Sequence, residues 1–216
     1  MTTFKIPNDL AENIAKGSCV LFLGADADLG ADGPPSRAYL AAALVNQYDL
    51  PPRESLAEAA SAFLCQYPHN RHGLIDFIKG RLTAALHTTA VHTAIVDLGF
   101  DAVVSAWYDG LLEQAYQEAG KRVARVVQGL DVAYATQGED IILIKLYGDI
   151  EQPDSLVVTR RDMMRVEGQL ARRLEDVRPY VRLRPILFVG WDPSDEGLAR
   201  LYTAATASLG EHKRRN

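Results

Sequence analysis

Cysteine is scarce in this sequence: 216 residues include only Cys19 and Cys65. Two thiols cannot form a four-thiolate zinc site, and they are too few for the disulfide framework of a small secreted protein. Cys19 lies in an apolar run and Cys65 in a helical pattern, so we expect both to be small, buried hydrophobic residues. His69 and His72 have no accompanying ligand residues and indicate a solvated helix start, so no metal is expected.

Long apolar runs are also missing. No segment approaches the ~20 apolar residues that span a bilayer, and no apolar stretch follows Lys5 as it would in a signal peptide. We therefore expect a soluble, cytoplasmic protein without a membrane partner.

Positive charge is in short supply. The chain has 23 Lys and Arg against 28 Asp and Glu, a net charge of −5. A negative surface repels phosphate backbones, and the few basic clusters, such as Lys213–Arg215, are typical of solvated faces and tails. No nucleic-acid partner is expected.

What is present is an ordinary globular composition, 48% apolar and 24% charged, without a repeat or a flexible linker. We therefore expect one domain, residues 1–216, in which short apolar runs alternate with helical patterns. The apolar runs predict strands at Cys19–Leu23, Ala102–Trp107, Val123–Val127, Ile141–Tyr147 and Ile186–Gly190, with an edge strand at Leu156–Thr159. The helical patterns cover Asn8–Lys16, Ser36–Tyr48, Glu54–Tyr67, His72–Leu86, Val91–Leu98, Asp109–Glu118, Arg160–Val177 and Ser194–Ser208.

This alternation predicts an α/β fold: a Rossmann-like, doubly wound, mainly parallel sheet with helices on both faces. The three helices between Tyr48 and Phe100 exceed what one crossover needs. They predict a small helical module, about residues 50–99, inserted in the sheet domain. Ligands of such sheets bind at the carboxyl ends of the strands, so the segments that follow the strands are the candidate site.

Four segments follow predicted strands. Gly24–Gly30 reads Gly-Ala-Asp-Ala-Asp-Leu-Gly, and a glycine-rich turn there can bring backbone N–H groups to a pyrophosphate, although a plain turn explains the composition equally well. Ser105–Glu113 reads Ser-Ala-Trp-Tyr-Asp-Gly-Leu-Leu-Glu. Lys145–Ile150 reads Lys-Leu-Tyr-Gly-Asp-Ile, and Leu187–Asp195 reads Leu-Phe-Val-Gly-Trp-Asp-Pro-Ser-Asp.

Together, and in this order, these segments resemble the sirtuin-like (silent information regulator-like) domains of bacterial proteins. That family typically reads Phe-Leu-Gly-Ala-Gly-Ala-Ser, Thr-Thr-Asn-Tyr-Asp-x-Leu-Leu-Glu, Lys-Leu-His-Gly-Asp and Phe-Val-Gly-Tyr-Ser at these places. The likeness runs from about Ile14 to Leu201. It implies a Rossmann-like NAD-binding sheet with a small helical module. Many bacterial members hydrolyse NAD in anti-phage defence, usually as one domain of a larger oligomeric protein.

The departures from the family pattern concern its catalytic positions. By the resemblance, the family's catalytic Asn falls on Trp107 and its catalytic His on Tyr147. Tryptophan offers no acceptor, and tyrosine titrates near pH 10, so neither can replace the lost side chain at neutral pH. No catalytic residue is therefore expected. The resemblance places the cofactor-binding cleft, in degenerate form, at Gly24, Ala25, Asp26, Asp28, Asp109, Gly190, Trp191 and Asp192.

Three aspartates of this cleft, Asp26, Asp28 and Asp192, oppose an anionic ligand. One carboxylate ~4 Å from a phosphate charge costs roughly 4 kcal/mol at an effective dielectric of 20, against ~8 kcal/mol for a micromolar ligand. The cleft is thus expected to be closed to NAD, and no cofactor is expected. Two alternatives stay open: the aspartates point to solvent and NAD binds, or they converge on a cation.

The sequence leaves three hypotheses for function. The first is a degenerate sirtuin-like domain that acts as a scaffold, or that binds a protein partner or a second copy, in a bacterial defence or signalling protein. The second is a divergent NAD hydrolase in which Tyr147, Asp149 or Asp28 is the base, and the third is a nucleotide-sensing domain. We also expect Asp26, Trp107, Tyr147 and Asp192 to meet in one pocket, with the Trp107 ring near Tyr147, and Asp109 to cap a helix.

Overall fold

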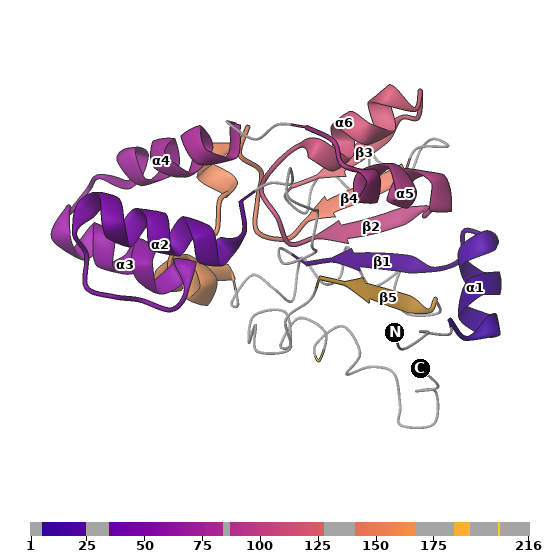
Figure 1. The fold of residues 1–216 in the computed structure, drawn as a ribbon, viewed down its shortest axis with the longest axis horizontal. Helices are drawn as coiled ribbons and strands as arrows, with labels where there is room; N and C mark the ends of the chain where they lie inside the picture. Colours follow the sequence, from indigo (N-terminus) through magenta and orange to yellow (C-terminus); the bar gives the residue numbers. More distant parts are fainter. Residues whose placement is uncertain are drawn as a thin grey trace.

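The chain forms a five-stranded, all-parallel sheet in the order β3-β4-β2-β1-β5 (Figure 1). The computed structural model describes residues 6–24, 35–83, 87–127, 141–166, 184–190 and 203. Its strands are β1 (Val20–Leu23), β2 (Ala102–Ser105), β3 (Val123–Val126), β4 (Ile141–Lys145) and β5 (Ile186–Val189). Its helices are α1 (Asn8–Ala15), α2 (Arg37–Tyr48), α3 (Leu56–Gln66), α4 (Arg71–Thr83), α5 (Ala90–Leu98), α6 (Leu111–Glu118) and the short η1 (Pro153–Ser155). Residues 160–166 are also helical.

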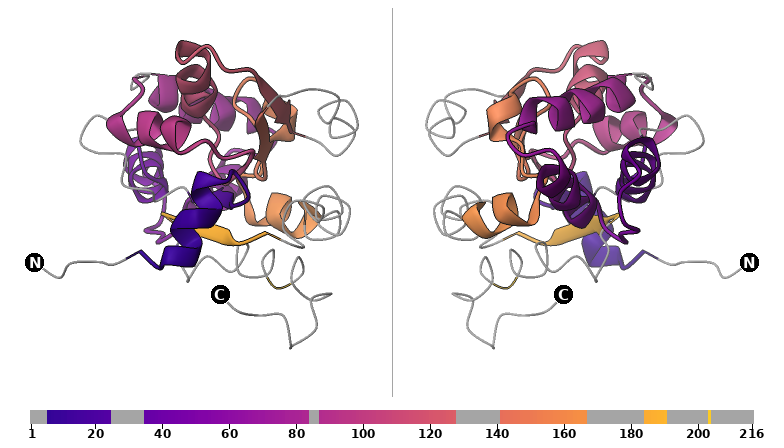
Figure 2. Two further views of the ribbon diagram at one scale, coloured as in Figure 1. Left: turned by 90° about the vertical axis from the view of Figure 1, so that its right-hand side faces the viewer. Right: turned by 90° about the vertical axis from the view of Figure 1, so that its left-hand side faces the viewer.

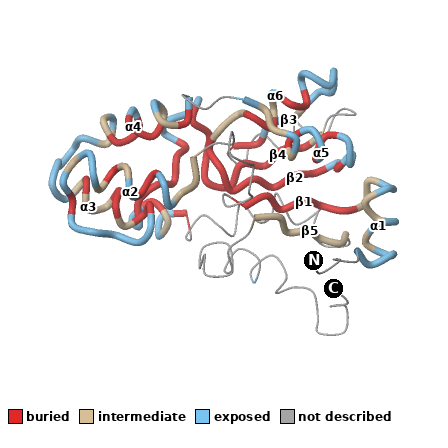
Figure 3. Tube along the Cα trace, viewed as in Figure 1, coloured by how far each residue is buried: buried red, intermediate tan, exposed pale blue. Residues whose placement is uncertain are grey.

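The two faces of the sheet carry separate cores, because alternate side chains of each strand point to opposite sides. Val20 and Phe22 pack with residues of α2, α3 and α4, whereas Leu21 and Leu23 pack with residues of α5 and α6. Figure 2, which looks along the strands, shows helices on both sides of the sheet. In Figure 3 the traces of β1 and β2 are buried throughout. The predicted α/β fold, Rossmann-like and doubly wound, is confirmed.

The strands end level with one another. Leu23 of β1 is in register with Ser105 of β2 and with Val189 of β5, and Ser105 is in register with Lys145 of β4. The backbone hydrogen bonds continue one residue further, from Gly24 N–H to Val189 O over 2.8 Å. The segments that follow β1, β2, β4 and β5 therefore start at one edge of the sheet.

The segment Leu156–Thr159 is not a strand, so that prediction is wrong. Its residues are buried, but their N–H groups bond outside any ladder. Val157 N–H donates to Tyr147 O over 2.9 Å, and the N–H groups of Val158 and Thr159 donate to Asp162 Oδ2. Apolar burial alone produced the strand-like pattern.

Cys65 is exposed, which corrects the expectation that both cysteines are buried; Cys19 is fully buried. The buried stripe of α3 runs through Leu56, Ala59, Ala60 and Phe63, at the spacing of one helix face. Cys65 lies off this stripe. Among the described residues, no helix is long and apolar enough to cross a membrane.

Arg71 joins α4 to the segment after η1. Its guanidinium bonds Asp162 Oδ2 and Leu156 O, each over 2.8 Å. Burial alone would raise the pKa of Asp162. The Arg71 guanidinium and the N–H groups of Thr159 and Val158 outweigh burial, so the pKa of Asp162 is lowered. The ion pair therefore stabilises the fold at neutral pH, and its contribution falls as the pH drops below the ordinary aspartate range.

We expect Arg71→Ala to lower the free energy of unfolding by about 2 kcal/mol, because it removes the nearer of the two cations beside the Asp162 carboxylate and leaves only the more exposed Arg165, at 3.7 Å. Urea denaturation at pH 7 measures the loss. The matched control is Lys16→Ala, whose ion pair with Glu12 is about two-thirds exposed (69% and 68%) and should contribute under ~0.5 kcal/mol. Equal effects of the two substitutions would show that the Arg71 contact is not stabilising.

Candidate functional site

The candidate site lies at the edge where the strands end. Between the ends of β1, β2, β4 and β5 the described residues enclose a cavity of about 10 Å³, room for about one water molecule. The lining is apolar apart from the backbone: Phe22, Leu23, Gly24, Val104, Ala106, Leu146 and Phe188. Small-molecule sites usually measure about 300–1,000 Å³. The cavity between the strand ends is therefore far smaller than a nucleotide.

Trp107 and Tyr147, the two residues at the family's catalytic positions, are both buried, at 5% and 3% exposure. Trp107 follows β2, and its backbone N–H donates to Ser105 Oγ over 3.2 Å. The indole ring is stacked on Tyr108 with the ring centroids 5.0 Å apart. Within the described part of the chain, the buried indole nitrogen Nε1 has no hydrogen-bond partner. The Trp107 side chain thus packs as a buried aromatic residue at this edge.

Arg37, the first residue of α2, contacts both aromatic rings. Its guanidinium carbon lies 4.9 Å from the Tyr147 ring centroid and 5.9 Å from that of Trp107. The same guanidinium donates to Ala106 O over 2.9 Å. A guanidinium over an aromatic face is attractive, more so away from water. Sequence reasoning missed Arg37. The one feature of the sequence that could have indicated it is a basic residue at the start of a helix, where the helix dipole disfavours a positive charge.

A group of four charged side chains, two of them buried, lies beside this edge and joins the ends of β2 and β4. Lys145 and Asp149 are each only 1% exposed. Lys145 Nζ lies 3.3 Å from Asp149 Oδ2 and 3.1 Å from Glu113 Oε1, and it donates to the carbonyl oxygens of Tyr108 and Asp109. Arg125 Nη1 approaches Asp149 Oδ2 to 3.0 Å. We call Lys145, Asp149, Glu113 and Arg125 the charge cluster.

The charge cluster also limits what Asp149 can do. Besides its two cations, the Asp149 carboxylate accepts the Glu151 N–H over 2.8 Å. A carboxylate with this many partners is held in one position. The geometry therefore disfavours Asp149 as a base. Gly148, between Tyr147 and Asp149, has φ +91°, and an added Cβ would lie 2.3 Å from Ser155 O, so only glycine fits there.

Asp109 stands one residue before the N-cap of α6, which is Gly110 rather than Asp109 as predicted, but its Oδ1 atom still accepts the N–H of Leu111, the first residue of the helix, over 3.0 Å. Its second carboxylate oxygen, Oδ2, is buried and has no hydrogen-bond partner among the described residues. Burial raises the pKa of Asp109 to about 6, with Lys145 opposing the shift and Glu113 and Asp149 adding to it. Asp109 is thus a carboxyl group that titrates close to neutrality.

The remaining predicted cleft residues fall into two groups. Gly24 follows β1 and Gly190 follows β5, at the edge just described; Gly190 has φ +64°. The others lie outside the described residues: Ala25, Asp26, Asp28, Trp191 and Asp192. Among the described residues, no three His, Cys, Asp or Glu side chains form a group that could hold a metal ion.

Comparison with known proteins decides the family. A model of the SIR2-like domain matches residues 101–216. The chain belongs to the SIR2-like domain family. The match covers β2 and everything after it, including the segments that hold Trp107 and Tyr147.

This SIR2-like chain is also similar to proteins described as NAD(+) hydrolase ThsA. The protein from Enterococcus faecium is 25% identical over 94% of this chain, and that from Bacillus cereus (strain MSX-D12) is 20% identical over 96%. A third, from Cytobacillus dafuensis, is 23% identical over 70%. The chain spans 43%, 44% and 31% of the lengths of these relatives.

Proposed function

We propose that this chain is a SIR2-like domain that does not hydrolyse NAD and that acts by binding a protein partner or a second copy of itself. The observation that carries the proposal is the packing of Arg37 against Trp107 and Tyr147. These two aromatic residues stand, by the family resemblance, where a catalytic Asn and His are expected. Both are buried, and neither offers a base at neutral pH. The setting we propose is a bacterial defence or signalling protein.

The described residues do not fit the hydrolysis of NAD by the family's own groups. A ribose and an attacking water need space and a polar group that orients them. The strand ends instead offer two packed rings, a guanidinium and a cavity of about 10 Å³.

The test is nicotinamide release from NAD by the purified chain, with the Enterococcus relative as the active reference. We expect the wild-type chain to release no more nicotinamide than a matched preparation of the Tyr147→Phe variant. This variant removes the hydroxyl group of Tyr147, and Trp107 has none. Release that is lost in the Tyr147→Phe preparation would overturn the proposal, because a contaminating hydrolase would remain in both samples.

A second candidate function is NAD hydrolysis through other residues, and the comparisons favour it. Three relatives described as NAD(+) hydrolases match 70–96% of the chain. Of the three bases named above, Asp28 lies outside the described residues, and Tyr147 and Asp149 are buried. Asp109, whose pKa is about 6, is the described carboxyl group with the most suitable protonation for a base.

The same assay separates this candidate from the first. Under the hydrolase hypothesis, Asp109→Asn or Asp28→Asn removes most of the nicotinamide release, whereas Asp97→Asn on the exposed face of α5 does not. Under our first proposal all four proteins are inactive. A nucleotide-sensing role would instead appear as a higher melting temperature with NAD or another nucleotide, without turnover.

A further inference from the structure

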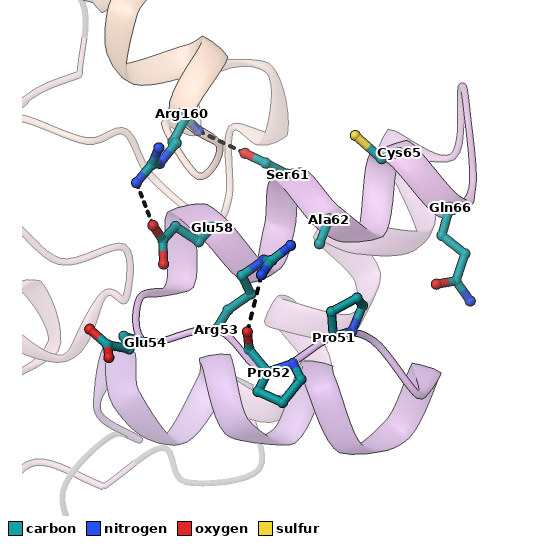
Figure 4. Close-up of a pocket in the computed structure, with 10 residues that line it drawn as sticks. All are labelled: Pro51, Pro52, Arg53, Glu54, Glu58, Ser61, Ala62, Cys65, Gln66 and Arg160. Carbon is teal, nitrogen blue, oxygen red and sulfur yellow. Dashed lines mark hydrogen bonds and ion pairs between the residues drawn. The ribbon is translucent and has the colours of Figure 1, made fainter.

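An open groove of about 640 Å³ lies in the helical part of the molecule and shares no residue with the edge where the strands end (Figure 4). It runs along α3, between the loop that precedes this helix and the helical residues 160–166. Its volume is in the usual range of small-molecule sites. The residues that matter are Pro51, Pro52, Arg53, Ala62, Cys65 and Arg160.

The floor of the groove is apolar and built from small side chains. Ala62 and Cys65 lie on the side of α3 that does not face the core. Pro51 and Pro52, both exposed, form the opposite wall, and proline rings lose no rotamer freedom when a ligand covers them. An apolar group placed here would remove exposed carbon from water without ordering long side chains.

One end of the groove is fixed by Arg160. The Arg160 guanidinium is ion-paired with Glu58, and the backbone N–H of Arg160 donates to Ser61 Oγ over 3.1 Å. The charge of Glu58 is therefore compensated within the groove wall.

The charge of Arg53 is not compensated in this way. Its guanidinium makes one hydrogen bond, to Pro52 O at 3.2 Å, and within the described part of the chain it has no acidic partner. Figure 4 shows the Glu54 carboxylate directed away from this guanidinium. Arg53 thus presents free N–H donors beside the apolar floor.

We propose that this groove binds a small organic anion, with a carboxylate or phosphate on Arg53 and an apolar body over Pro51, Pro52 and Ala62. A guanidinium can bind either anion through two parallel hydrogen bonds. The apolar body accounts for the floor, which a bare inorganic ion would not use. This site is separate from the strand ends and does not depend on whether the domain hydrolyses NAD.

Cys65 supplies a reporter within the groove, and Cys19 supplies a control. Cys65 is exposed, whereas Cys19 is fully buried and burial raises its pKa, so a folded protein should be alkylated at Cys65 only. The experiment measures the rate at which iodoacetamide alkylates Cys65 in the presence of millimolar benzoate, phenyl phosphate or the neutral benzamide, at constant ionic strength. Alkylation of Cys19 would identify unfolded protein.

We expect benzoate and phenyl phosphate to slow the alkylation of Cys65 about fivefold at saturation and benzamide to have no effect. Arg53→Gln should remove the protection, and Ala62→Phe, which fills the floor, should do the same. Arg161→Gln is the matched control: it makes the same charge change one residue from Arg160, does not line the groove, and should keep the protection. Protection by benzamide equal to that by benzoate, unchanged protection in Arg53→Gln, or no protection by either anion would each overturn the proposal.

Discussion

Replacing Lys145 with methionine is expected to lower the free energy of unfolding by about 4 kcal/mol, because removing one partner of a buried ion pair leaves uncompensated charge in the interior. Lys145 is 1% exposed and lies within 3.3 Å of a carboxylate oxygen of both Asp149 and Glu113. Methionine matches the lysine side chain through Cε and lacks only the terminal ammonium group. The loss therefore reports charge rather than a cavity.

The matched control is Lys79→Met. Lys79 pairs with Glu151 at 3.5 Å, but the two side chains are 42% and 62% exposed, so a loss below ~1 kcal/mol is expected. A double substitution, Lys145→Met with Asp149→Asn, should recover part of the stability, because it also neutralises the buried Asp149 carboxylate, which keeps only Arg125 as a cation once Lys145 is removed. Urea denaturation at pH 7 of the wild type, Lys145→Met, Asp149→Asn and the double variant gives the coupling energy, and Lys79→Met is measured beside them. Equal losses for Lys145→Met and Lys79→Met would show that the charge cluster does not hold the ends of β2 and β4.

The sheet could be predicted from sequence because its signal is local. Each of β1, β2, β4 and β5 is a short run of apolar residues that are buried or half-buried, and such runs are typical of parallel strands covered on both faces. Leu156–Thr159 gives the same signal without pairing, because Leu156, Val157 and Val158 are buried in the hydrophobic core and need apolar side chains just as a strand does.

The arrangement at the strand ends could be predicted only in part. Register places the residues after β1, β2 and β4 at one edge, so Trp107 and Tyr147 could be expected near one another. Arg37, which contacts both rings, lies 69 residues from Ala106, to which it donates, and no local pattern announces such a contact. The charge cluster was missed for the same reason: Lys145 appears in the sequence as one polar residue in an apolar strand.

Asp109→Asn is expected to stabilise the protein at neutral pH by about 2–3 kcal/mol. The pKa of Asp109 is raised to about 6 in the folded state by burial, whereas the ordinary value is 3.8. The folded state therefore prefers the protonated carboxyl group, and the gap between the two values corresponds to about 3 kcal/mol. At pH 7 the wild-type protein keeps a charged, desolvated carboxylate. Asparagine removes the charge and still accepts the Leu111 N–H through its Oδ1 atom.

The sign of the pH dependence follows from this shift. The contribution of Asp109 is fully present below about pH 3.8 and is lost as the pH rises through about 6. The advantage of Asp109→Asn should therefore be near zero at pH 4, grow between pH 4 and 6, and stay constant above that. Asp162, whose pKa is lowered, contributes in the opposite direction. Comparing variant with wild type at each pH cancels that contribution.

Urea denaturation of both proteins from pH 4 to pH 8 measures this difference. Asp97→Asn is the control, because it makes the same change on the exposed surface of α5. We expect it to change the free energy of unfolding by no more than ~0.5 kcal/mol. A stability difference that does not vary between pH 4 and 6 would mean that Asp109 is charged in the folded state throughout. Lys145, which lowers the pKa of Asp109, would then outweigh the cost of burial, and Asp109 would be one more anion of the charge cluster. A loss of stability at every pH would instead show that the buried Oδ2 atom needs to accept a bond that an amide group cannot.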